Sequence, residues 1–213
     1  MTHRTLYLGG AAAGAVVVSL ALAPTGTAAT GHHHPAREHT VSARLNPLNN
    51  SGVTGHGVIT VEGRRMHVRY DATKLAPGLP HAAHIHYGAQ ARHECPTVRD
   101  DSNGDFRLNV AEGVPAYGGI VKSLTTRGDT SPDSALAVDR FPTAPRGTVH
   151  YKRLITTTRA VAHAVRRGEG VLVVHGVDYN HNGRYDFASA GASELDPSLP
   201  AEATDPAVCG VLR

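Results

Sequence analysis

Short segments in which apolar and polar residues alternate recur along most of this chain, with turn-forming residues between them. Val41, Ala43 and Leu45 alternate with polar neighbours until a turn-rich stretch at residues 49–52 interrupts the pattern. A side-chain period of two is that of a β-strand with one buried face. Several short strands at this spacing favour an antiparallel β-sandwich or barrel.

Ten segments are strand candidates, one of them the continuous apolar run at residues 171–174. One further segment without Gly or Pro brings its apolar residues to one side, as a short helix does. We expect an all-β fold with strands at residues 41–45, 58–61, 66–70, 84–86, 106–110, 119–124, 136–141, 148–155, 171–174 and 208–212, one short helix at 156–167, and long loops.

Composition agrees with an all-β fold and narrows the range of partners. Aromatic residues make up 5% of the 213 residues, Trp is absent, and Gly (23) and Pro (13) are plentiful, which suits strands joined by turns. The net charge is +3, and Lys and Arg are scattered along the sequence, so we expect no nucleic-acid partner. The length suits one folded domain, which we place at residues 39–213.

The first 29 residues are typical of an export signal. Arg4 provides positive charge, residues 6–23 are mostly small and apolar, and the small residues at 27–29 offer a cleavage site. The alternative is an uncleaved membrane anchor, because the apolar run is long enough for one. We favour secretion, with no membrane span left after cleavage; an oxidising compartment would then let Cys95 and Cys209 pair.

A polar, histidine-rich leader follows at residues 30–38, and we expect it to be disordered. If cleavage falls after Ala29, His32 is the third residue of the mature chain. A free amine, two amide nitrogens and an imidazole then form the planar four-nitrogen set that Cu(II) prefers. The alternative is a leader that binds nothing.

A His-Ile-His sequence in one of the expected strands is a candidate metal site. His84 and His86 project from one face while Ile85 points to the other, so two imidazoles can chelate one ion while the strand still packs. The alternative is a pair of solvent-facing histidines. A second histidine segment lies far along the chain, where the apolar run 171–174 ends in His175, and Asp178 could orient that imidazole or a neighbouring one.

This order of segments resembles the copper/zinc superoxide dismutase family, a Greek-key β-sandwich. The likeness covers residues 42–70, the His84/His86 pair, Cys95 nine residues after His86, His175 after its Val-Val run, and Cys209 near the end. The resemblance implies copper ligands at His84, His86 and His175 and a disulfide between Cys95 and Cys209.

The family's zinc and substrate-guiding residues have no counterpart in this sequence. The family's bridging histidine, six residues after the first cysteine, is replaced by Asp101, and residues 122–139 contain no histidine. Pro206 stands where the family has the arginine that guides superoxide, and such electrostatic guidance raises on-rates strongly. We therefore expect no zinc site of the family type, and impaired superoxide turnover.

The segment His-Ala-Ala-His-Ile-His-Tyr-Gly at 81–88 also resembles the CHRD domain, a secreted sheet domain to which no catalytic activity is generally attached. We therefore favour a secreted CHRD/superoxide dismutase-like module, non-enzymatic, that binds one copper ion through the three histidines. The alternatives are a copper-only superoxide dismutase and a structural cell-surface module with calcium-stabilised loops.

One loop has the spacing of a calcium site. Asp178, Asn180, Asn182 and Asp186 place side-chain oxygens at positions 1, 3, 5 and 9 of an EF-hand-like loop, and Gly183 occupies the sharp-turn position. The alternative is an ordinary turn, since Asp and Asn side chains bond their own backbone.

Overall fold

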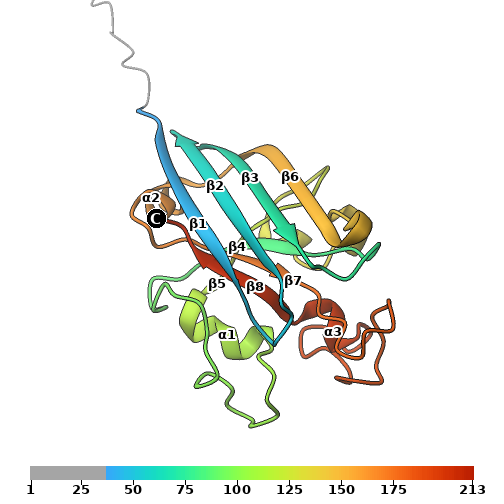
Figure 1. Cartoon of the computed structure of the whole chain (residues 1–213). Coiled ribbons are helices and arrows are strands. Elements are labelled where there is room, and N and C mark those ends of the chain that lie inside the picture. The colour runs from blue at the N-terminus through green and yellow to red at the C-terminus, as the bar shows by residue number, and fades with distance from the viewer. Residues whose placement is uncertain (1–36) are drawn as a thin grey trace, which may run out of the picture. The chain divides into compact units, whose positions relative to one another are not determined.

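The computed structural model describes residues 37–213 (Figure 1). The predicted signal peptide at 1–29, the leader up to residue 36 and the candidate copper ligand His32 lie outside these residues.

Eight strands, three α-helices and three short 3-10 helices make up the regular structure of residues 37–213. Every strand pairs antiparallel with its neighbours in the order β5-β4-β7-β8-β1-β2-β3-β6. The strands are β1 (His39–Pro47), β2 (Thr54–Glu62), β3 (Arg65–Thr73), β4 (Ala83–Tyr87), β5 (Gly119–Ser123), β6 (Thr148–Thr156), β7 (Val171–His175) and β8 (Pro206–Val211). The helices are α1 (Val110–Tyr117), α2 (Arg159–Arg166) and α3 (Ala201–Thr204). No helix in the described part of the chain combines the length and apolar character needed to cross a bilayer. The predicted all-β fold is confirmed.

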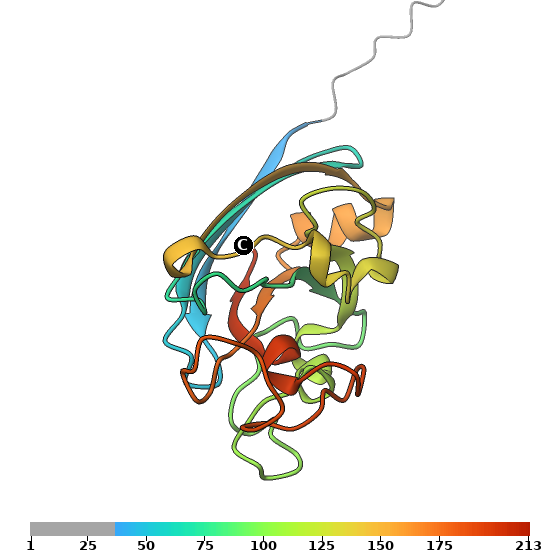
Figure 2. The ribbon, with the colours of Figure 1, turned by 90° about the vertical axis from the view of Figure 1, so that its right-hand side faces the viewer.

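The eight strands form two half-sheets that curl toward each other. The first half-sheet (β1, β2, β3 and β6) is seen as a curved layer in Figure 2, and a short pairing of β1 with β8 joins it to the second half-sheet (β5, β4, β7 and β8). In β3 every second residue is buried, so the alternation seen in the sequence marks the inner face. Apolar side chains from both halves form one core, in which Tyr70 stacks on Tyr151 at 5.1 Å between ring centroids.

The second half-sheet is covered on both faces. Every residue of β7 is buried, as expected of a strand with a continuous apolar run. Its inner face belongs to the main core, and its outer face holds a smaller cluster of Leu48, Leu108, Tyr117, Val171, Val173 and Cys209. Helix α1 and the long loop that precedes it supply part of this cover.

Two predicted strands are wrong. Residues 106–110 lead into helix α1, because the side chain of Asn109 accepts a hydrogen bond from the amide of Glu112, and the Glu112 carboxylate accepts one from the Asn109 amide. Residues 136–141 contain a short 3-10 helix, Val138–Arg140. The predicted helix is confirmed as α2, capped by Thr158, and α1 and α3 are additional to it.

The disulfide between Cys95 and Cys209 is confirmed. It links residues 114 positions apart with a Cα–Cα distance of 5.8 Å, and joins the loop between β4 and α1 to the middle of β8. Cys209 pairs with Val173, which pairs with His84, so the bridge lies on the outer face that carries the histidine.

Replacing both cysteines (Cys95→Ala with Cys209→Ala) is expected to lower the free energy of unfolding by about 3–5 kcal/mol, because the bridge restricts a long loop of the unfolded chain. Urea denaturation followed by circular dichroism measures the change. Dithiothreitol treatment of the unaltered protein is the control, since it opens the bridge without removing a packed side chain. Unchanged unfolding midpoints in both experiments would contradict the prediction.

Candidate metal centre

Three histidines from two adjacent strands converge on the outer face of the second half-sheet. His84 pairs with Val173 and His86 with Val171 across β4 and β7, so all four side chains share this face, and His175 ends β7 on the same side. All three imidazoles are buried, and one ring nitrogen from each lies within 4.8 Å of the others. These residues form the histidine triad. Sequence analysis named all three.

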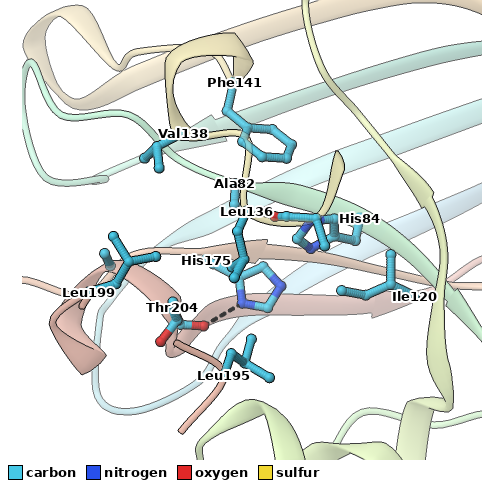
Figure 3. Close-up of a pocket in the computed structure, with 12 residues that line it drawn as sticks. Ala82, His84, Ile120, Leu136, Val138, Phe141, His175, Leu195, Leu199 and Thr204 are labelled. Carbon is cyan, nitrogen blue, oxygen red and sulfur yellow. Dashed lines mark hydrogen bonds between the residues drawn. The ribbon is translucent and has the colours of Figure 1, made fainter. Parts of the chain in front are cut away.

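Each imidazole of the triad donates its N–H to a backbone carbonyl. His84 Nε2 donates to the Ala135 oxygen at 3.1 Å, and His86 Nδ1 to the Gly118 oxygen at 3.0 Å. His175 Nδ1 donates to the Thr204 oxygen at 2.7 Å (Figure 3). A carbonyl can only accept, so the proton of each neutral ring is on the bonded nitrogen.

The second nitrogen of each ring is a lone-pair donor without a partner. His84 Nδ1, His86 Nε2 and His175 Nε2 are buried and have no hydrogen bond. A buried polar atom left unpaired costs about 1–3 kcal/mol, so three in one cluster need an explanation. A metal ion satisfies all three at once, and the triad could hold one.

Burial keeps the triad neutral at physiological pH. Desolvation is the main cause in each case: it lowers the pKa of His86 to about 3 and of His175 to about 4, and it lowers the pKa of His84 well below its usual value. The neighbouring imidazoles lower these pKa values further. No carboxylate is among the causes for any of the three rings. The donor set is therefore three neutral nitrogens, ready to bind metal without losing a proton.

Aromatic side chains hold the triad rings in place. The ring of Tyr117 lies 4.3 Å from that of His86, and the ring of Phe141 lies edge-on to His84 at 5.4 Å. Tyr117 is itself fixed, because its hydroxyl donates to the Val110 oxygen at 3.1 Å. The packing leaves the rings little freedom to turn away from a shared ion.

Gly118 brings one of the orienting carbonyls to its place. This residue ends α1 with φ 85°, and a Cβ here would come within 2.4 Å of the backbone of Tyr87 and Gly88. Only glycine allows this approach, which puts the Gly118 oxygen against His86. Sequence analysis missed Ala135, Gly118 and Thr204, because a backbone carbonyl leaves no residue-type signal.

The side chain of His81 contacts the backbone of the triad residue His175. Its Nδ1 lies 2.8 Å from the His175 carbonyl oxygen, its Nε2 lies 3.1 Å from that of Ala76, and the Tyr185 hydroxyl is 3.2 Å from Nδ1. The prediction that Asp178 orients the His175 imidazole is wrong. The His175 side chain uses the Thr204 carbonyl instead, while the Asp178 carboxylate accepts from the amides of its own loop.

The candidate calcium loop has the hydrogen bonds of a tight turn. The Asp178 carboxylate accepts from the amides of Asn182 and Gly183, and Asn182 Nδ2 donates to Asp186 at 2.6 Å. Asn180 also accepts from the Asn182 amide. The turn interpretation accounts for these contacts, and calcium binding stays a prediction.

Comparison of the sequence with models of known protein families and with curated proteins finds no match to either. The structure itself defines the class: an all-β, disulfide-linked fold with a buried histidine triad that could hold a metal ion.

In the presence of a chelator, the protein is expected to lose stability as the pH falls from about 6.5 toward about 4. The folded pKa values lie below the unfolded value of 6.5, so the unfolded chain binds more protons in this window, and each histidine contributes up to about 1.4 kcal/mol per pH unit. Denaturation in EDTA at several pH values measures this slope. His86→Gln should make it shallower, and His67→Gln, at an exposed position on β3, should not. Equal slopes of stability against pH in the parent and in both variants would contradict the prediction.

Proposed function

We propose that this protein is a secreted metal-binding module of the CHRD/superoxide dismutase-like type, which holds one copper ion through His84, His86 and His175 and does not turn over superoxide. The observation that carries this proposal is the arrangement of the triad. Three buried nitrogens have their tautomers set by carbonyls and their lone pairs free, and they lie close enough to share one ion.

Two general considerations favour copper over zinc in this proposal. Imidazole suits both metals, but at a given nitrogen site Cu(II) binds more tightly than Zn(II). Burying charge is costly, and no carboxylate acts on these rings to offset a divalent ion. Copper alone of the two can also bind as a monovalent ion, which reduces that cost.

The family resemblance is supported by features that it implied. These are the antiparallel two-layer sheet, the convergence of the three histidines and the Cys95–Cys209 bridge. The bridge also supports secretion, because such bonds persist in oxidising compartments. It agrees with the export signal expected at residues 1–29.

The surroundings of the triad argue against superoxide turnover. Asp101, in the place of the bridging histidine, uses its carboxylate to accept from the amides of Gly104 and Phe106 in its own loop. Pro206, in the place of the guiding arginine, has no charge and pairs with His175 in the sheet. No cation stands in for that arginine among the side chains that line the pocket beside the triad.

Titration with copper is expected to show one tight site. Loss of a residue that only supports a metal ligand typically lowers metal affinity about 10–100-fold, and His84→Ala should lower the copper affinity by more than that. The protein for this test carries the substitutions His32→Gln, His33→Gln and His34→Gln, so that the leader cannot bind the metal. His67→Ala, on the solvent face of β3, is the matched control and should bind copper like its parent. Isothermal titration calorimetry with a competing chelator gives the affinities.

The copper titration also separates the competing interpretations. Tight copper binding that His84→Ala abolishes supports the triad as the site. Binding that survives in His84→Ala, or no tight binding in the parent, would refute the copper proposal and leave a structural module.

The copper-loaded protein is expected to dismutate superoxide no faster than its His84→Ala variant, because no cationic side chain lines the pocket beside the triad to guide the anion. Pulse radiolysis, with free copper removed by chelation, measures this directly. A rate that rises with bound copper and falls with ionic strength would point instead to a copper-only dismutase, since electrostatically guided encounter is sensitive to salt.

A further inference from the structure

A pocket with almost wholly apolar walls adjoins the triad. The rings of His84 and His175 form part of its wall, and the side chains of Leu136, Phe141, Leu195 and Leu199 face them (Figure 3). Its volume is about 30 Å³, and a water molecule needs about 10–15 Å³ on the same scale. The pocket therefore has room for a molecule of a few heavy atoms.

The polar groups at the pocket wall are already engaged. The Ala135 carbonyl accepts from His84, and the Thr204 carbonyl from His175. The Thr204 hydroxyl donates to Ser193 at 2.8 Å. No Lys, Arg, Asp or Glu side chain lines the pocket. The unpaired nitrogens of the His84 and His175 rings are buried, so no exposed polar atom at the wall is free to pair with a charged or hydrogen-bonding guest.

We propose that this apolar pocket binds a small uncharged apolar molecule, of the size of a diatomic gas or a two-carbon hydrocarbon, against the ligands of the metal, and that the metal-free pocket excludes anions. The part of this inference that concerns the metal rests on the proposed copper site. The binding of an apolar guest does not, because the pocket is built from side chains alone.

Physical chemistry favours such a guest over the alternatives. Water in the pocket would find few polar partners, and enclosed apolar cavities are known to stay dry and take up xenon. In the metal-free protein an anion would lose its hydration and find no cationic side chain at the wall, a penalty of several kcal/mol. An uncharged apolar molecule loses little solvation and gains dispersion contacts with the leucine, phenylalanine and imidazole surfaces.

The first test uses xenon on the metal-free full chain, read by ¹H–¹³C NMR of the pocket methyl groups. Saturable shifts are expected at Leu136, Leu195 and Leu199. Ala203→Leu, which fills the pocket from α3, should abolish them, and so should Leu199→Phe if the first variant fails to fold. Ala160→Leu, at an exposed position of α2, is the matched control and should leave them unchanged.

The second test uses azide on the metal-free full chain, read by the same methyl signals. The parent should show no azide-dependent shifts at near-neutral pH. Leu195→Arg, which adds a cation at the half-exposed rim, should acquire them, with azide bound at least about tenfold more tightly. Azide-dependent shifts in the parent, or no gain in Leu195→Arg, would overturn the exclusion of anions.

The two tests fail separately from the copper proposal. If xenon leaves the pocket methyl groups unshifted while copper still binds, the pocket inference is wrong and the metal site stands. If copper does not bind but xenon shifts the methyl groups and Ala203→Leu removes the shifts, the pocket stands and the proposed function is wrong.

Discussion

Three hydrogen bonds from imidazole N–H groups to backbone carbonyls determine what this site can do. They place the proton of each ring on the nitrogen that faces Ala135, Gly118 or Thr204, and so leave the opposite lone pair facing the other rings. Without them, each buried imidazole could turn or change tautomer, and the three lone pairs would not converge. The strands bring the rings together, and the hydrogen bonds to the carbonyls orient the free lone pairs so that the rings can act as metal ligands.

These carbonyls belong to three segments that pack over the outer face of the second half-sheet. The Gly118 carbonyl comes from the end of α1, that of Ala135 from the loop after β5, and that of Thr204 from the end of α3. The disulfide fastens the loop before α1 to β8, on the face where the triad lies. The stability of the cover and the geometry of the metal centre are thus linked, because the same segments provide both.

The neutrality of the centre sets its chemistry. Burial holds the pKa values of the triad low, no carboxylate balances the ion, and the adjoining pocket offers no charged side chain. Such surroundings favour a metal of low charge, and the uncharged side chains of the pocket favour an uncharged guest over an anion. The same absence of charged side chains therefore underlies both the proposal of copper and the class of molecule proposed for the pocket.

The sequence by itself determined the strands with clean alternation, the helix α2 and the common face of His84 and His86, because these depend on local periodicity. The pairing of Cys95 with Cys209 and the partnership with His175 were implied by a family resemblance and depend on the tertiary fold. Only that fold decided that residues 106–110 enter a helix, that the Thr204 carbonyl rather than Asp178 orients His175, and that an apolar pocket adjoins the triad. The reason is physical: backbone carbonyls and cavities arise from segments distant in sequence, and neither leaves a pattern in residue type.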